Sequence, residues 1–273
     1  MTFARNSLVR DMTFRTNFIL QCVSSLGWTA MNVGFYLIIF QYADTIGADS
    51  GWDRERFFLF VATTWIINSI VQAFFMPNAE EFSEMIRTGG LDFALLKPID
   101  TQFLISFRRM DYSSLANFFA GIVIAAVSLV ILANREVDAV IPSPLTATLY
   151  LLFVVMGVAI MYSLMICLSA TSIWLGRNQT LYNFWFYITN FSRYPMEMYN
   201  RGWGTALYGF FTFVVPVLVV VNVPARILAR PVMPRDAYDW TLMGWMVIAT
   251  LFSVWASRRV FSLALKSYRS ASS

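Results

Sequence analysis

The sequence predicts an all-α polytopic membrane protein. Of its 273 residues, 58% are hydrophobic and only 13% are charged, whereas a soluble domain carries roughly a quarter charged residues. The mean hydropathy is +0.59. The apolar runs are long and continuous, and such runs form helices because every backbone polar group inside a bilayer must be paired internally. A membrane β-barrel would show short strands of alternating polarity instead.

Six segments are apolar enough to cross a bilayer, which takes about 20 residues. They cover residues 18–42, 57–76, 112–133, 144–175, 181–198 and 240–261, and the fifth is less apolar and rich in aromatic residues. The connection after the first segment carries more acidic than basic residues, which favours an external loop. We therefore expect both termini in the cytoplasm and the chain in the inner membrane.

A further apolar stretch, residues 207–228, is interrupted by Pro216 and Pro224. Proline removes a helical hydrogen bond and clashes with the preceding turn. The stretch is either a seventh span or a pair of half-helices that enter the membrane and return on one side, and the distribution of Lys and Arg separates the two only slightly. We expect six spans with a re-entrant hairpin and external loop within residues 203–235. The whole chain, 1–273, is then one transmembrane domain that begins with an interfacial helix at residues 1–16.

The longest cytoplasmic connection, residues 77–111, carries the signals of a short and sharply stopped helix. Asn78 can cap its start, and Glu81 completes a pair that resembles a capping box. Arg87 lies in the last turn, and Gly89 with Gly90 can supply a left-handed stop. A second amphipathic stretch runs from residue 91 to residue 96. This element could transmit motion from a soluble partner, or it could simply join two spans.

Uncharged polar residues recur at helical spacing in three of the spans. Such stripes face protein or water, because lipid offers them no partner. They form either hydrogen bonds between helices or the wall of a pathway for an amphiphilic substrate. The stripes are Gln21, Ser25, Trp28 and Asn32 in the first span, Thr64, Asn68 and Gln72 in the second, and Asn183, Tyr187, Asn190 and Tyr194 in the fifth.

Several classes of function are disfavoured by what the sequence lacks. The chain has no histidine, no GxSxG motif and no GxxxxGK[ST] phosphate loop. Ionisable residues are nearly absent from the cores of the predicted spans, which argues against a proton- or sodium-coupled transporter. We expect no catalytic residue and no metal site, and Cys22 and Cys167 are small packing residues.

Three stretches resemble bacterial permeases of the type-2 ABC exporter class. The sequence IRTGGLDFALLKP at residues 86–98 resembles a signature of the cytoplasmic loop after their second span. Phe184-Trp185 and RYPMEMY at residues 193–199 resemble a later conserved pattern, and Pro216 with Pro224 resembles the proline-broken hairpin. Gly90 departs from the loop pattern, which has a polar or β-branched residue there.

The resemblance implies six spans, a cytoplasmic coupling helix between spans two and three, and a re-entrant hairpin before span six. It implies a pair of permeases, of the same or related chains, on two ATPase subunits that hold ATP and magnesium, so this chain itself needs no cofactor. The implied ATPase-coupling residues are Glu81, Arg87, Leu91, Asp92, Phe93, Leu95, Lys97 and Pro98. Because spans two and five face the dimer axis in that class, the implied pathway residues are Asn68, Gln72, Asn183, Tyr187 and Asn190.

The function expected from these observations is that of a permease subunit in an ATP-driven exporter in the bacterial inner membrane. It would move an amphiphilic substrate out of the cytoplasm and would not be an enzyme by itself. Its partners would be an ABC ATPase, a second permease and membrane lipid, with no nucleic acid. A structural or scaffold subunit of a membrane complex would explain the spans and the hairpin equally well, and only the loop motif argues against it.

Overall fold

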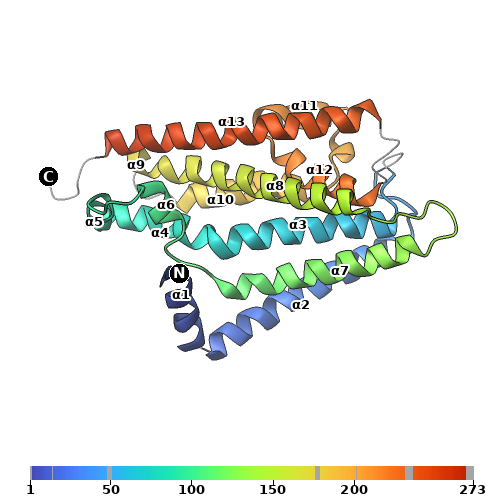
Figure 1. Ribbon diagram of the computed structural model, residues 1–273, viewed down its shortest axis with the longest axis horizontal. Coiled ribbons are helices and arrows are strands. Elements are labelled where there is room, and N and C mark those ends of the chain that lie inside the picture. The colour runs from blue at the N-terminus through green and yellow to red at the C-terminus, as the bar shows by residue number, and fades with distance from the viewer. Residues whose placement is uncertain are drawn as a thin grey trace.

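The computed structural model describes residues 2–13, 15–47, 51–175, 179–200, 202–230 and 236–268, and the side chains of residues 2–4, 10, 11 and 179–183 lie outside the description. Within these ranges the regular structure is helical and no strand occurs. The long helices lie side by side in one bundle (Figure 1). The all-α fold predicted from composition is confirmed.

Among the described residues, five helices are long and apolar enough to cross a membrane. They correspond to the first four predicted spans and the last one, and the chain is a multi-pass membrane protein. These helices are α2 (Arg15–Ile39), α3 (Arg54–Phe74), α7 (Leu115–Ala133), α8 (Pro144–Ala170) and α13 (Ala237–Ser267).

The two ends of the bundle differ. One end, here named the cap end, carries three short helices that together form the cap, α4 (Met76–Arg87), α5 (Gly90–Leu95) and α6 (Thr101–Ser106), and the end of α13 lies beside them (Figure 1). Helix α1 (Thr2–Thr13) is attached there, because the Met110 amide donates to the Ser7 hydroxyl over 3.1 Å. The opposite end, here named the far end, holds the connection between α7 and α8 and the start of α13.

The fifth predicted span, residues 181–198, is not one continuous helix. Helix α10 (Gln179–Asn190) has 12 residues, which is about 18 Å at 1.5 Å per residue and shorter than the hydrocarbon core of about 30 Å. The chain continues in two 3₁₀ turns, η2 (Phe191–Arg193) and η3 (Met196–Tyr199). Pro195 explains the interruption, because a proline forces the residue before it out of the helical region, and Tyr194 is extended at φ −123°, ψ 150°.

The proline-containing stretch is a sharply bent pair of helical limbs. Helix α11 (Gly204–Gly209) and the π-helical turn Phe210–Val214 meet helix α12 (Val217–Ala229) at 85°, and Pro216 lies at the break. Both limbs return to the start of α13: the hydroxyls of Tyr208 and Tyr238 lie 2.5 Å apart, and Arg226 pairs with Asp239. Both limbs thus reach the start of α13, as a re-entrant hairpin requires, and the choice between a hairpin and a bent span stays a prediction. Residues 231–235 of the expected loop lie outside the described residues.

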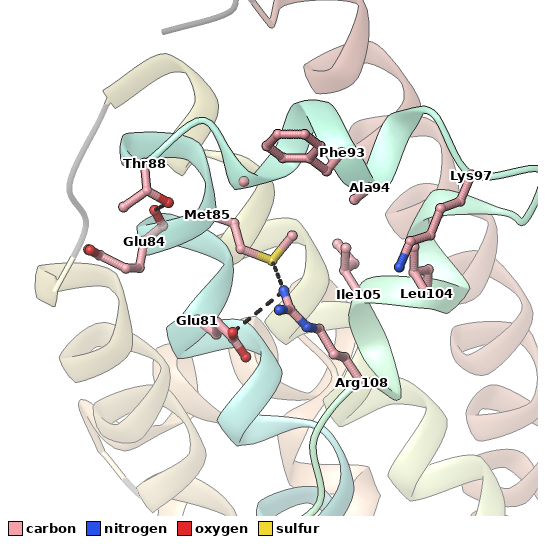
Figure 2. A pocket seen from close by; sticks show the side chains of 11 residues that line it. Glu81, Glu84, Met85, Thr88, Phe93, Ala94, Lys97, Leu104, Ile105 and Arg108 are labelled. Atoms are coloured by element: carbon pink, nitrogen blue, oxygen red, sulfur yellow. Dashed lines mark hydrogen bonds and ion pairs between the residues drawn. The ribbon is translucent and has the colours of Figure 1, made fainter. Parts of the chain in front are cut away.

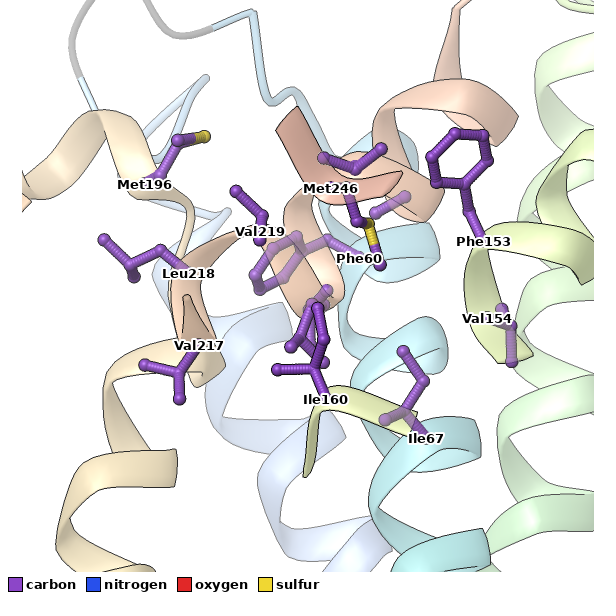
Figure 3. Close-up of a cluster of buried hydrophobic side chains, with 14 of the residues drawn as sticks. Phe60, Ile67, Phe153, Val154, Ile160, Met196, Val217, Leu218, Val219 and Met246 are labelled. Atoms are coloured by element: carbon purple, nitrogen blue, oxygen red, sulfur yellow. The ribbon is translucent and has the colours of Figure 1, made fainter. Parts of the chain in front are cut away.

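Helix α12 is buried along its whole length between α3, α8 and α13, and Figure 3 shows its residues Val217 and Val219 among side chains from those neighbours. Pro224 does not break α12, but it has no N–H for the carbonyl four residues earlier, that of Val220. Gly157 of α8 faces this carbonyl so closely that a Cβ on Gly157 would lie 2.8 Å from the Val220 oxygen. The absent side chain thus lets two helices approach at the point where Pro224 leaves a carbonyl without its helical partner.

A buried cluster of ion pairs joins the end of α12 to η3 and to the start of α13. Arg226, near the end of α12, is 6% exposed and pairs with both Glu197 and Asp239. The indole N–H of Trp52 donates to Glu197 over 3.1 Å. Removing one member of such a buried pair leaves an uncompensated charge, so these residues hold η3, α12 and α13 together.

We expect Gly157→Ala to destabilise the protein. The added Cβ has backbone and not a flexible side chain as its nearest neighbour, and overpacking of a core costs about 1–3 kcal/mol. Gly27→Ala is the matched control, since a Cβ at Gly27 meets nothing within 4 Å and alanine favours a helix over glycine by up to about 1 kcal/mol. Thermal unfolding in detergent, followed by tryptophan fluorescence, should show a lower midpoint for Gly157→Ala alone. Equal midpoints would show that α8 and α12 are not in close contact.

Candidate functional site

The helix expected at residues 78–88 is a continuation of span α3. Helix α4 follows α3 after the single residue Phe75, and together they form an apolar helix of 34 residues, Arg54–Arg87. The second predicted span ended at residue 76, but the helix continues through Pro77, which lies in the first turn of α4, where a missing N–H has no helical partner to lose. The cap is therefore joined directly to the most deeply packed span.

The predicted capping role of Asn78 is also wrong. Its side chain is buried, donates to the carbonyls of Phe74, Ser106 and Arg109 at 2.7–2.9 Å, and accepts from the Arg109 amide at 2.7 Å. An asparagine can saturate its donors and acceptor only when several backbone groups converge on it. Asn78 therefore fastens the α3–α4 junction to the segment that follows α6.

Glu81 strengthens the same attachment. Its carboxylate lies 3.0 Å from Arg109 and 3.5 Å from Arg108, so it faces the cap interior and forms no capping box with Asn78. Arg87 lies in the last turn of α4, as expected, and pairs with Glu84 on the exposed surface. A surface pair of this kind contributes little stability.

The stop after α4 is made by one glycine. Gly89 has φ +71°, the left-handed conformation that glycine adopts without strain, whereas Gly90 is already the first residue of α5. The chain reverses at Gly89 and brings Leu91 back against α4, where it is fully buried. Half of the predicted Gly89-Gly90 stop is thus confirmed.

The cap rests on two spans through a second apolar core. Phe82 of α4, Leu91 of α5 and Leu104 of α6 pack with Ile166 of α8 and Phe261 of α13. The rings of Phe82 and Phe261 lie 5.8 Å apart between centroids. Buried side chains pack at crystal-like density and transmit displacement, so a movement of the cap reaches α8 and α13 as well as α3.

The outward face of the cap is apolar. Phe93 and Leu96 are 73% and 81% exposed, and Leu95, Lys97 and Pro98 are exposed beside them. Exposed apolar patches mark contact sites for other proteins or for the membrane. Asp92 lies on the inner side, beside Tyr268; burial first and then this carboxylate raise the pKa of the Tyr268 hydroxyl.

A cavity of about 310 Å³ opens between the three helices of the cap (Figure 2). Its floor holds the Glu81–Arg108 ion pair, with Glu84 on one side and Lys97 on the other, and Phe93 stands at its rim. The cavity thus combines an apolar rim with charges of both signs inside. The structure thus gathers five of the eight predicted coupling residues, Glu81, Phe93, Leu95, Lys97 and Pro98, in or beside one surface.

Helix α6 was not expected from the sequence. Asp100 caps it by accepting from the Phe103 amide at 2.9 Å and also binds Arg258 of α13 at 2.8 Å. The hydrogen bond from Arg258 lowers the pKa of Asp100, against a smaller opposing effect of desolvation. Tyr162 of α8 adds hydrogen bonds to Gln102 and Ser106. The aspartate directly before an apolar run was the signal in the sequence for this helix.

Two of the predicted pathway residues meet in a second cavity. Asn68 and Gln72 line a crevice of about 270 Å³ between α2, α3 and α7, which Arg193 of η2 also lines. Trp28, Asn32 and Thr64 from the polar stripes lie there too. Tyr187 and Asn190 of α10 are not among the residues that line it, and the side chain of Asn183 lies outside the described residues.

Comparison with known proteins identifies the family. A family model described as "ABC-2 family transporter protein" matches residues 26–272. The chain belongs to this family. It is therefore a membrane permease component of an ABC transporter, as the loop motif predicted, and the ABC-2 permease family implies an ABC ATPase as partner in general. Neither the curated proteins nor the solved structures include a match to the chain.

We expect Asp100→Ala to loosen the cap of this ABC-2 permease. It removes both the helix cap, worth about 1 kcal/mol, and an exposed ion pair, worth at most about 1 kcal/mol. Hydrogen exchange of the amides in residues 101–106 should accelerate roughly five- to tenfold. Asp100→Asn should accelerate it less, because asparagine also caps helices.

Acidification should act like the substitution. Because the pKa of Asp100 is lowered by folding, its contribution is present above the unfolded-state pKa of about 3.9 and is lost as the pH falls below that value. Asp44→Ala, at the exposed far end, is the control and should leave residues 101–106 unchanged. Unaltered exchange in Asp100→Ala would refute the tie between α6 and α13.

Proposed function

We propose that this chain is the permease subunit of an ATP-driven exporter and that a separate ATPase docks on the outward face of the cap. The single observation that carries the proposal is the attachment of the cap to three spans, because it provides a path for motion from a soluble partner into the membrane. The substrate is amphiphilic and leaves the cytoplasm. ATP and magnesium are held by the partner, and this chain supplies no catalytic group.

The attachment has three parts, each on a different span. Helix α4 continues α3, the second apolar core joins the cap to α8 and α13, and Asp100 binds Arg258 of α13. ATP-driven closure of the ATPases would bind one arrangement of the cap better than another. That difference in binding free energy is what shifts a conformational equilibrium.

The docking surface consists of Phe93, Leu95, Leu96, Lys97 and Pro98 with the cavity behind Phe93. Binding energy at protein interfaces concentrates in a few aromatic or basic anchors that fill pockets. Phe93 and Lys97 have this character and are exposed. Asp92 and Leu91 act indirectly, since Leu91 is buried and Asp92 lies beside Tyr268.

The cap end is the cytoplasmic end in this proposal, and the chain lies in a bacterial inner membrane. Both termini then face the cytoplasm, helix α1 lies at the interface, and the α11–α12 hairpin enters from the outside and returns there. A second permease, identical or related, completes the pathway. The rival function, a scaffold that carries no substrate, is an outcome of the first test below.

We expect Phe93→Ala to weaken ATPase association about tenfold or more, as for an interface anchor. The truncation should leave the fold intact because the ring is 73% exposed. Phe119→Ala on α7 is the matched control, since that ring is 61% exposed and α7 is not part of the cap. The three forms are purified gently from native membranes, and the co-purifying ATPase is measured by quantitative mass spectrometry and ATP hydrolysis.

Two results would contradict this role. Equal ATPase recovery with Phe93→Ala would show that the face is not the docking surface. No ATPase with the wild-type chain would favour the scaffold function.

A cysteine at Ser267, the last residue of α13, should react with a membrane-impermeant maleimide only after the cytoplasmic side is opened. Cys22 and Cys167 are first replaced by alanine so that the new thiol alone reports. Thr45→Cys at the far end should react from outside in intact cells and controls for reagent access. Labelling of the cysteine at Ser267 in intact cells would reverse the orientation.

A further inference from the structure

The crevice between α2, α3 and α7 has the composition of a binding site for an anionic amphiphile. It is lined by amides and hydroxyls from three spans, by the rings of Trp28, Trp65 and Tyr36, and by one cation, Arg193, with no carboxylate among the lining residues that the structure describes. A helix–helix contact would fill such a space with side chains, but about 270 Å³ stays open. Both the open volume and the positive charge of Arg193 indicate space for a ligand.

The amides on α3 need a partner that the described part of the chain does not provide. Within that part, no hydrogen bond satisfies the side chain of Asn68 or Gln72, although their neighbours Thr64 and Asn32 bond to backbone carbonyls at 3.0 and 2.8 Å. An amide without a partner costs several kcal/mol in hydrocarbon. Asn68 and Gln72 therefore face either water or a polar ligand in the crevice.

Arg193 supplies the charge. Its guanidinium lies over the Phe186 ring, 5.3 Å from the centroid, and in the described residues it forms no ion pair with a carboxylate. By contrast, three arginines at the far end, Arg226, Arg135 and Arg56, each form an ion pair with an aspartate or glutamate. An arginine that lines a polar crevice without a carboxylate has donors ready for an anion, and its planar fork suits carboxylate and phosphate.

The crevice is too small for a whole lipid-like molecule but opens beside helix α2. Ligand pockets usually measure about 300–1,000 Å³, so 270 Å³ suits a headgroup and the first part of a chain. Helix α2 has few buried residues, since only 6% of its most apolar stretch is buried inside the bundle. Trp28 of α2 is 62% exposed at the edge of the crevice. An apolar tail can leave past α2 into lipid while the headgroup stays inside.

We propose that this crevice binds an amphiphile through an anionic headgroup, with Arg193 as the residue that selects its charge and Asn68 and Gln72 as hydrogen-bond donors along α3. The inference rests on the proposed transport function, because the crevice flanks the span that continues into the cap. The polar lane from Thr64 to Gln72 is about 12 Å long at 1.5 Å per residue. The ligand chemistry is a carboxylate or phosphate on an apolar tail.

The test uses the full-length chain with its co-purifying partners in nanodiscs of phosphatidylcholine. The probes are 11-(dansylamino)undecanoate and its uncharged methyl ester, and binding is followed by energy transfer from tryptophan, since Trp28 and Trp65 line the crevice. We expect the carboxylate to bind about tenfold more tightly than the ester. Arg193→Gln should abolish this preference, whereas Arg193→Lys should keep most of it because the charge remains.

Arg259→Gln is the matched control. Arg259 also lies over an aromatic ring, that of Trp255 at 5.7 Å, but it does not line the crevice, so the preference should persist. Asn68→Leu should weaken both probes, because it removes an amide from the wall. Equal affinity of the wild-type chain for the two probes, or an unchanged preference in Arg193→Gln, would overturn the proposal.

Adding anionic phosphatidylglycerol to the nanodiscs separates the two sources of the anion. Displacement of the carboxylate probe from the wild-type chain, with no displacement from Arg193→Gln, identifies a lipid headgroup as the occupant. Retention of the probe identifies a free anionic amphiphile, and both results support an anion site. If the ATPase co-purifies but the chain does not prefer the carboxylate probe, the anion site is refuted and the permease function stands. If the chain prefers the carboxylate probe but no ATPase co-purifies, the anion site stands and the ATP-driven function is refuted.

Discussion

Helix α3 packs against other helices on nearly every side, and the positions of those helices depend on this packing. These neighbours are α7, α8 and α12, and 72% of the most apolar stretch of the Arg54–Arg87 helix is buried inside the bundle. Only the face with Thr64, Asn68 and Gln72 is left beside an open crevice. Because a close-packed interior transmits strain and has little room to deform, a change in the position of α3 requires its neighbours to move with it.

Much of the fold was accessible from the sequence because lipid imposes a simple rule. Long apolar runs had to be helices, and four spans together with the last one lie where hydropathy placed them. The short elements were harder because their signals depend on tertiary contacts. The second predicted span ended before Pro77, which occupies a first helical turn, and the fifth included Pro195, which forces Tyr194 into an extended conformation.

The candidate site was predictable in outline but not in its internal contacts. Periodicity identified Asn68 and Gln72 as a polar face, and the glycine at position 89 identified the reversal of the chain. Nothing local indicated that Asn78 would bind Arg109 or that Asp100 would bind Arg258, because partners 31 and 158 positions apart leave no periodic trace. Likewise, Arg193 was recognised as part of a motif, and its place in the crevice became visible only once η2 was folded against α3.

The continuity of α3 with α4 has a mechanical consequence. A helix of 34 residues is about 50 Å long at 1.5 Å per residue, so the cap and the far end are the two arms of one lever. A tilt of about 5° around one end displaces the other by roughly 4 Å, which is comparable to the width of a methylene chain. Because the second apolar core joins the cap to α8 and α13, these two helices would move together with it. In the proposed function, a small movement of the soluble ATPase would then open or close a passage on the opposite face of the membrane without any part of the chain unfolding.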